Sequence, residues 1–362
     1  MAKIKHLFTQ KTTTLLGLDI GASAVKLLEI SADSHRFRLE SYAIEPVVEN
    51  SAVASRITNP KAVGKALQQS ILKSGTKLNR AAVALSDSKV IRKIIKMPAS
   101  LSAEEMESRI HLEADQFISF PLDNISLDFE VQGINSVTPE LMDVFLVACR
   151  TTDVDMCVSA LKMGGLICDV VDIEANAVES AMNLIADQLP DAGFGKLVAV
   201  IDMGATKTKI TVLHDMKVMH SREQSLGGQA LSEKIQAYFG LSYEEAECAK
   251  CQGGLPKEYL SEVLEPFKKA MVSQVVCGLR LFFSVHSFNT IDHVVLTGGC
   301  SLINGMEQLI QEALGVPTSI ANPFSTLSIS PKINLEQLTE DSSFLMLACG
   351  LALRGFQQNG DD

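Results

Sequence analysis

The sequence predicts an α/β protein made of two duplicated lobes around one cleft, with a smaller inserted subdomain. Two observations carry this prediction. A segment of strand, turn and strand occurs twice, half a chain apart, and a β-α-β-β-α segment without that signature stands between the copies. A chain of 362 residues, 46% of them hydrophobic, is long enough for two domains of about 150 to 200 residues each.

The repeated segment reads TTLLGLDIGASAVKLLEI over 13–30 and KLVAVIDMGATKTKITVL over 196–213. An offset of 183 positions superimposes Asp19 on Asp202, Gly21 on Gly204, Ala22 on Ala205 and Lys26 on Lys209. In each copy an apolar strand ends in an acidic residue and a turn of small residues. Such a turn presents backbone N–H groups to an anion, and its carboxylate can hold a metal ion or the water around one. Asp-x-Gly alone is common in hairpins, but two copies predict two lobes that grip one polyphosphate.

Start and stop signals assign the rest of the first half. Asn59-Pro60 begins a helix that ends at Gly75. We predict strands at 81–85 and 90–97, a helix capped by Ser102 and Glu105, strands at 127–131 and 144–149, and a helix at 153–163. This order indicates an inserted subdomain at 81–167. A strand at 168–173 and a helix at 174–189 then return the chain to the first lobe.

The second half begins with a link at 190–195. After the second repeat we predict a strand at 218–223, the turn Leu226-Gly227-Gly228, and helices between 231 and 283. A buried strand at 293–297 runs into Gly298-Gly299-Cys300-Ser301, and helices follow at 305–314 and 345–356. We therefore expect the first lobe at 12–80, 168–190 and 325–356, and the second lobe at 196–324 with a helical subdomain at 230–285.

Composition excludes several classes of protein. The net charge of −11 argues against a nucleic-acid partner, because such partners are bound through Lys and Arg. The sequence contains no run of 18 apolar residues, so we predict no membrane span. The first ten residues are too polar for a signal sequence. Eight scattered cysteines indicate a reduced, cytoplasmic compartment. The pair Cys248 and Cys251 lacks the further ligands of a zinc site.

Five segments fall at strand ends or helix starts, at 19–23, 173–177, 202–206, 296–299 and 348–352. Glycine in the turns lets a phosphate approach the backbone, and Lys26 can bring a point charge to an inner phosphate. A side chain at Gly298 or Gly299 would collide with a base or ribose lying across that turn. The order of the five resembles the actin-like ATPase superfamily, in which the first and third hold phosphates, the second and fifth connect the lobes, and the fourth passes beside adenosine.

This resemblance implies ATP and Mg²⁺ as cofactors, with Asp19 and Asp202 as the metal-binding carboxylates. The residues expected to bind the nucleotide are Asp19, Gly21, Ala22, Ser23, Ala24, Lys26, Asp202, Gly204, Ala205, Thr206, Lys207, Gly227, Gly228, Gly298, Gly299 and Ser301.

Hydrolysis of ATP is a separate question. The superfamily often places an acid or amide at the start of the connecting helix to orient the attacking water, and Glu174 occupies that position as the candidate catalytic residue. A carboxylate favoured by the helix dipole explains the same residue equally well. Slow hydrolysis therefore stays open.

Within the superfamily the chain resembles the PilM family of type IV pilus assembly proteins over nearly its whole length. The matching segments are LGLDIG at 16–21 with VKLLE at 25–29, EADQ at 113–116 with FPL at 120–122, LDFEVQG at 127–133, VDIE at 171–174 and LTGG at 296–299. The related division protein FtsA carries a similar inserted subdomain, but it also has a C-terminal amphipathic membrane helix that this sequence lacks.

The family resemblance implies an ATP-binding scaffold on the cytoplasmic side of the inner membrane, in the alignment complex that supports twitching motility. There it would bind the N-terminal cytoplasmic peptide of PilN and contact other pilus components, so that its contact with the membrane is indirect. Two alternatives stay open. A small-molecule kinase of the superfamily would need a substrate-activating base, and a filament-forming ATPase would need lengthwise contacts that have no sequence motif.

Overall fold

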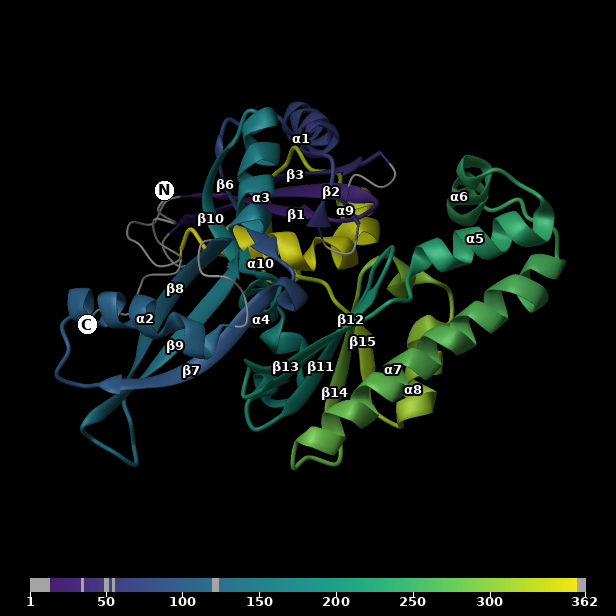
Figure 1. The fold of residues 1–362 in the computed structure, drawn as a ribbon. Coiled ribbons are helices and arrows are strands. Elements are labelled where there is room, and N and C mark those ends of the chain that lie inside the picture. Colours follow the sequence, from purple (N-terminus) through teal and green to yellow (C-terminus); the bar gives the residue numbers. More distant parts are fainter. Residues whose placement is uncertain (1–13, 34–35, 49–51, 54–55, 119–123, 357–362) are drawn as a thin grey trace.

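The computed structural model of this chain describes residues 14–33, 36–48, 52–53, 56–118 and 124–356 (Figure 1). The N-terminal segment, the FPL motif at 120–122 and the polar tail after 356 lie outside the described residues.

Two large sheets form the two lobes (Figure 1). The first sheet has the spatial order β10 (Ile167–Ile173), β6 (Arg80–Leu85), β1 (Leu16–Ile20), β2 (Ala24–Asp33), β3 (Arg36–Pro46) and β16 (Ser328–Ile329). The second has the order β13 (Lys217–Gln224), β12 (Thr208–His214), β11 (Leu197–Met203), β14 (His293–Thr297) and β15 (Thr318–Ile320). A short pair, β4 (Ala52–Val53) and β5 (Arg56–Ile57), stands before α1 (Pro60–Ser74).

The duplication predicted from the sequence is present in the backbone. In β1 and β2 Asp19 lies opposite Lys26, and in β11 and β12 Asp202 lies opposite Lys209. The two turns close in the same way, because the Gly21 amide donates to the Ala24 carbonyl at 2.9 Å and the Gly204 amide donates to the Lys207 carbonyl at 3.0 Å. The same residues at the same spacing therefore build the same hairpin in each lobe.

The inserted subdomain is smaller than predicted. It consists of a three-stranded sheet in the order β7 (Val90–Pro98), β9 (Leu141–Arg150) and β8 (Ile125–Ile134), with α2 (Ala103–Phe117) packed on one face. The predicted boundary of 81–167 is wrong at both ends. β6 pairs in parallel with β1 and β10 inside the first lobe, and α3 (Thr151–Met163) packs on α1. Gly64 permits that packing, since a Cβ there would lie 2.6 Å from the Cβ of Met163.

Helices α4 (Glu174–Leu184) and α10 (Met346–Leu353) cross between the two sheets. Gly350 of α10 approaches so closely that an added Cβ would lie 1.7 Å from the Ala177 carbonyl oxygen of α4. Gly17 of β1 gives α10 similar room against the first sheet. The core around this crossing includes Leu28 and Leu39 from the first lobe and Val200 and Val295 from the second. The crossing is therefore the shared wall on which both lobes pack.

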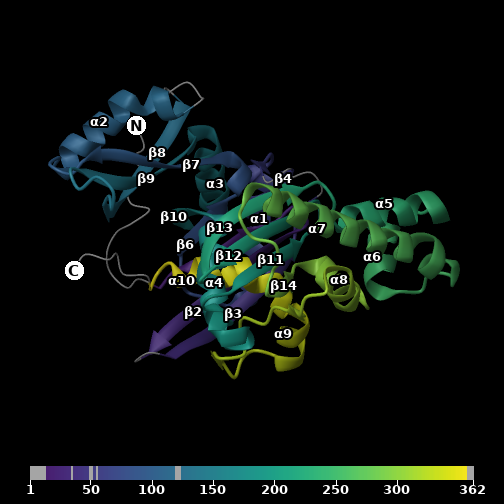
Figure 2. The same ribbon diagram turned by 90° about the horizontal axis from the view of Figure 1, so that it is seen from below.

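The helix predicted at 174–189 ends early, at Leu184, and two 3₁₀ turns, Ala186–Gln188 and Pro190–Gly193, complete the link to the second lobe. Helices α5 (Gly228–Phe239), α6 (Tyr243–Gln252) and α7 (Glu265–Val285) form an arm at one end of the molecule, and the inserted subdomain stands at the other (Figure 2). Helix α8 (Met306–Leu314) follows β14 in the chain, and α9 (Leu335–Asp341) follows β16.

Candidate functional site

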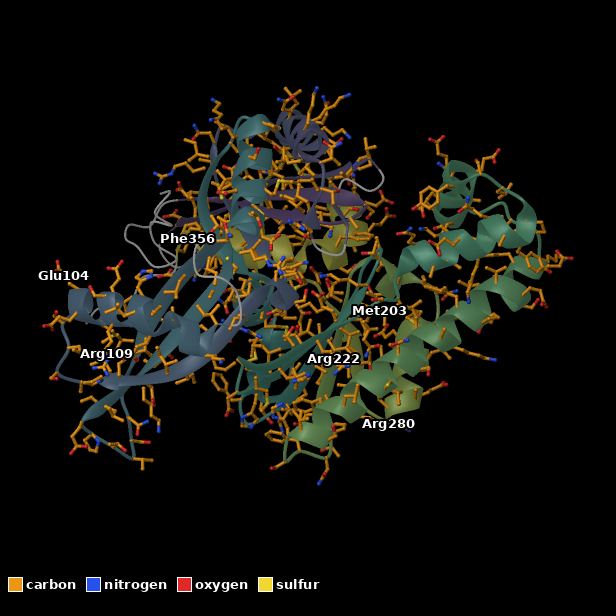
Figure 3. All side chains as sticks on the ribbon, viewed as in Figure 1. Glu104, Arg109, Met203, Arg222, Arg280 and Phe356 are labelled. Atoms are coloured by element: carbon orange, nitrogen blue, oxygen red, sulfur yellow. The ribbon has the colours of Figure 1, made fainter. Side chains whose placement is uncertain are left out.

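A cavity of about 820 Å³ lies between the lobes and is lined by residues of both repeat turns. Its walls also include α6, the turn after β14 and the start of α4. Figure 3 labels Met203, the last residue of β11, near the centre of the molecule where the second turn begins. The predicted site residues that line the cavity are Asp19, Gly21, Ala22, Ser23, Ala24, Lys26, Glu174, Asp202, Gly204, Ala205, Thr206, Lys207, Gly228, Gly298 and Gly299.

Charges from the two repeats meet on the floor of this cavity. The Lys26 ammonium lies 2.6 Å from the Asp19 carboxylate of its own hairpin. Although burial lowers the pKa of Lys26, Asp19 and Asp202 outweigh it and raise that pKa above its usual value. Lys26 of the first lobe therefore interacts electrostatically with Asp202 of the second lobe. The two repeat turns thus face the same cleft.

Asp202 occupies an unfavourable position for an isolated carboxylate. Burial raises the pKa of Asp202, the nearby Lys26 opposes this, and the charges of Asp19 and Glu174 add to it. A divalent cation bound by Asp19 and Asp202 would offset this repulsion. Among the residues that the structure describes, no group of three His, Cys, Asp or Glu side chains could hold a metal alone. Mg²⁺ in this cleft would thus need phosphate oxygens and water as further ligands, which is how Mg²⁺ is usually bound.

Glu174 begins α4 and is held by lysines of the second lobe. Its Oε2 accepts a hydrogen bond from Lys209 Nζ at 3.0 Å and lies 3.7 Å from Lys207 Nζ. Burial raises the pKa of Glu174, but the charges of Lys209 and Lys207 lower it by a larger amount. The pKa of Glu174 therefore lies below its usual value. The carboxylate is therefore ionised at neutral pH and oriented at the wall of the cleft.

The turn after β14 requires glycine for two reasons. Gly298 has a φ of 80°, and a Cβ there would lie 2.3 Å from Asp202 Oδ1. Ser301 does not line the cavity. It is buried, and its hydroxyl donates to the Gly298 carbonyl at 2.6 Å, so that it braces the turn from behind.

Gly227 is also absent from the cavity lining. A Cβ there would lie 2.5 Å from the Ala205 carbonyl oxygen, and the following amide, that of Gly228, donates to the Gly204 carbonyl at 3.0 Å. Gly227 and Ser301, both predicted to bind the nucleotide, are therefore not among the residues that line the cavity. Both support the loops that do.

Several lining residues were not predicted. They include Tyr243, Glu247 and Lys250 of α6, together with Asn304 and Phe344. Lys250 Nζ donates to Glu247 Oε1 at 2.6 Å and to Ser232 Oγ at 2.8 Å, which ties α6 to α5 beside the cavity. Only the Glu-x-x-Lys spacing on α6 marked this pair in the sequence. Lys209, which does not line the cavity but holds Glu174, had a clearer signal, since it superimposes on Lys26 in the repeat.

No helix in the part of the chain that the structure describes is both long and apolar enough to cross a membrane.

Comparisons with known proteins agree with this architecture. A solved structure described as the "PilM-PilN type IV pilus biogenesis complex" matches with a TM-score of 0.79 and 28% identity, covering 96% of this chain and 100% of that one. The cell division protein FtsA of Pseudomonas aeruginosa is 21% identical over 398 residues, covering 97% of this chain and 91% of FtsA. The ethanolamine utilization protein EutJ of Carboxydothermus hydrogenoformans matches with a TM-score of 0.54 and 14% identity over 95% of this chain and 90% of that one, which shows the fold alone.

These matches confirm the predicted actin-like ATPase fold. The model of the family described as "Type IV pilus assembly protein PilM" matches residues 17–356. This match covers most of the chain, from the first strand to the end of the last helix, and the protein therefore belongs to the PilM family of type IV pilus assembly proteins.

Proposed function

We propose that this protein is an ATP-binding scaffold of the type IV pilus machinery. The observation that carries the proposal is the convergence of two hairpins of the same register, Asp19 to Lys26 and Asp202 to Lys209, on one interlobe cavity. A polyphosphate between them would receive backbone amides from both turns and the positive charge of Lys26 and Lys207. A bound Mg²⁺ would supply charge neutralisation between these carboxylates and the phosphates.

The cavity also fits the nucleoside end of such a ligand. Gly298 and Gly299 leave space beside the second turn, and Tyr243 and Phe344 provide aromatic surface among the lining residues. Aromatic and apolar walls with a few charged groups are typical of small-molecule sites. Glu174 is the carboxylate available to orient water at the terminal phosphate, which would give slow hydrolysis.

The partner in this proposal is the N-terminal cytoplasmic peptide of PilN, which would place the protein at the inner face of the inner membrane. Support comes from the solved PilM-PilN complex, whose matched chain this protein covers in full at 28% identity. A synthetic peptide of the PilN N-terminus should bind the full chain in a fluorescence anisotropy titration, and a peptide of scrambled order should not. Equal binding of both peptides would contradict the assignment.

Asp19→Asn should weaken binding of ATP with Mg²⁺ by tenfold or more, a loss of about 1.4 kcal/mol. The amide keeps the shape of the side chain but removes one of the two charges expected to hold the cation. Isothermal titration calorimetry with Mg²⁺ and with EDTA checks this. Wild-type affinity should fall when Mg²⁺ is removed, whereas the variant should respond little.

Asp169→Asn is the matched control, because Asp169 is similarly buried and ion-paired, to Arg80, but lies outside the cavity lining. Its ATP affinity should equal that of the wild type. Undiminished affinity in Asp19→Asn, or no heat of binding in the wild type, would refute the nucleotide site.

A further inference from the structure

A closed set of charged and hydroxyl side chains joins the cleft to the inserted subdomain. We call it the junction ring, and its members are Ser86, Asp87, Ser88, Glu174, Lys207, Lys209 and Glu223. The first three belong to the connection between β6 of the first lobe and β7 of the inserted subdomain. The lysines and Glu223 belong to the second lobe, so three parts of the molecule meet here.

Lys209 forms one half of the ring. Its ammonium pairs with Asp87 and also donates to Glu174 at 3.0 Å. Only 4% of the Lys209 side chain and 7% of the Asp87 side chain are exposed, so this pair is held in a low dielectric. Asp87 Oδ1 also lies 3.4 Å from Arg92 Nη2, which belongs to β7. Asp87 thus links the second lobe to the first strand of the inserted subdomain.

Glu223 forms the other half. Its Oε1 accepts hydrogen bonds from Lys207 Nζ and Ser86 Oγ, and its Oε2 accepts one from Ser88 Oγ at 3.1 Å. Figure 3 labels the neighbouring residue, Arg222, on β13. The Glu223 carboxylate of the second lobe therefore binds two serines of the β6–β7 connection, Ser86 and Ser88, and also Lys207 of the second repeat turn.

Three members of the ring line the cavity, Ser86, Glu174 and Lys207, and Lys207 is the cation among them. Asp87 and Glu223 do not line it. A triphosphate carries several negative charges and Glu223 carries one, so a phosphate that comes as close to Lys207 as Glu223 does attracts the ammonium more strongly. When Lys207 turns to that phosphate, Glu223 loses its cation and its hold on Ser86 and Ser88 changes.

We propose that the junction ring couples nucleotide in the cleft to the attachment of the inserted subdomain, with Lys207 exchanging Glu223 for phosphate. This inference rests on the proposed nucleotide site and adds a regulatory role for Asp87 and Glu223, which do not line it. Coupling of this kind is reciprocal. A partner that moves the inserted subdomain changes the affinity for ATP by the same factor as ATP changes the affinity for that partner.

Glu223→Gln tests the exchange, because the amide keeps hydrogen bonds to the serines but no longer competes for Lys207. ATP affinity by calorimetry should rise about fivefold, the lower end of typical coupling between sites. Hydrogen–deuterium exchange of the full chain gives a second measurement. Exchange of the amides at 86–92 should change when ATP is added to the wild type, and in Glu223→Gln the same addition should change it little, because Lys207 no longer leaves a charged partner there.

Glu179→Gln is the matched control. Glu179 also pairs with a lysine, Lys217 at 2.7 Å, but it belongs to neither the ring nor the cavity. Its ATP affinity and its exchange at 86–92 should match the wild type. If the wild type binds ATP but Glu223→Gln leaves both measurements unchanged, the ring carries no coupling while the nucleotide site stands. If the wild type binds no ATP at all, the proposed function itself fails.

Discussion

Replacing Gly350 with valine is expected to destabilise the first lobe by about 3 kcal/mol or more. A Cβ at this position would lie 1.7 Å from the Ala177 carbonyl oxygen and 2.6 Å from its carbonyl carbon. Neither helix can yield easily, because α10 is also packed on β1 through Gly17. Calorimetry should show a thermal midpoint lower by on the order of 10 °C for a lobe of this size.

Gly315→Val separates the steric effect from the cost of replacing any glycine. Gly315 ends α8 with a φ of 66°, and an added Cβ there would meet nothing within 4 Å. Backbone strain alone should cost about 1–2 kcal/mol. If both variants lose the same stability, the close contact between α4 and α10 is not the reason that position 350 requires glycine.

The crossing shows what local sequence can indicate. The place of 348–352 as the fifth of five segments indicated a connection between the lobes, through the resemblance to the superfamily. Which glycine touches which carbonyl depends on how α10 lies against α4, and nothing in either helix alone specifies that. The duplicated hairpins were predictable for the opposite reason, since Asp19 and Lys26 belong to one local unit whose register is set by its own turn.

The boundaries of the inserted subdomain could not be predicted from the hydrophobic pattern of the sequence. β6 is an apolar strand and α3 an amphipathic helix, as they would be in either subdomain. Their assignment depends on β6 lying between β1 and β10 and on α3 lying against α1, which are contacts between distant parts of the sequence. No turn or cap residue encodes such pairing.

The candidate site divides in the same way. The two turns were predictable because glycine and aspartate are needed there for local reasons. Asp87 and Glu223 were not, since each stands in an ordinary polar position and gains its role only when β13 lies beside the β6–β7 connection. Sequence reasoning thus found the turn residues that line the cavity and missed the carboxylates that hold Lys207 and Lys209.

Lys209→Ala should destabilise the protein by about 3–5 kcal/mol, because it leaves the carboxylates of Asp87 and Glu174 buried without their shared cation. Lys209 is itself almost fully buried, so water cannot replace the ammonium without opening the interface between the lobes. Calorimetry at neutral pH should show a midpoint lower by on the order of 10 °C. Lys217→Ala is the control, since its side chain is 79% exposed and its pair with Glu179 should contribute little.

The pH dependence of the Lys209→Ala defect identifies its cause. In the wild type the lysines hold the pKa of Glu174 below its usual value of 4.5. A carboxylate with a depressed pKa contributes stability that is present above its unfolded pKa and lost as the pH falls through its folded pKa. The difference in unfolding free energy between wild type and variant should therefore be largest at neutral pH and shrink on acidification, because a neutral carboxyl no longer needs the cation. Urea unfolding at pH 7 and pH 4 measures it. A defect of equal size at both pH values would mean that Lys209 stabilises the protein through the packing of its aliphatic chain, and the junction ring would then lack its electrostatic basis.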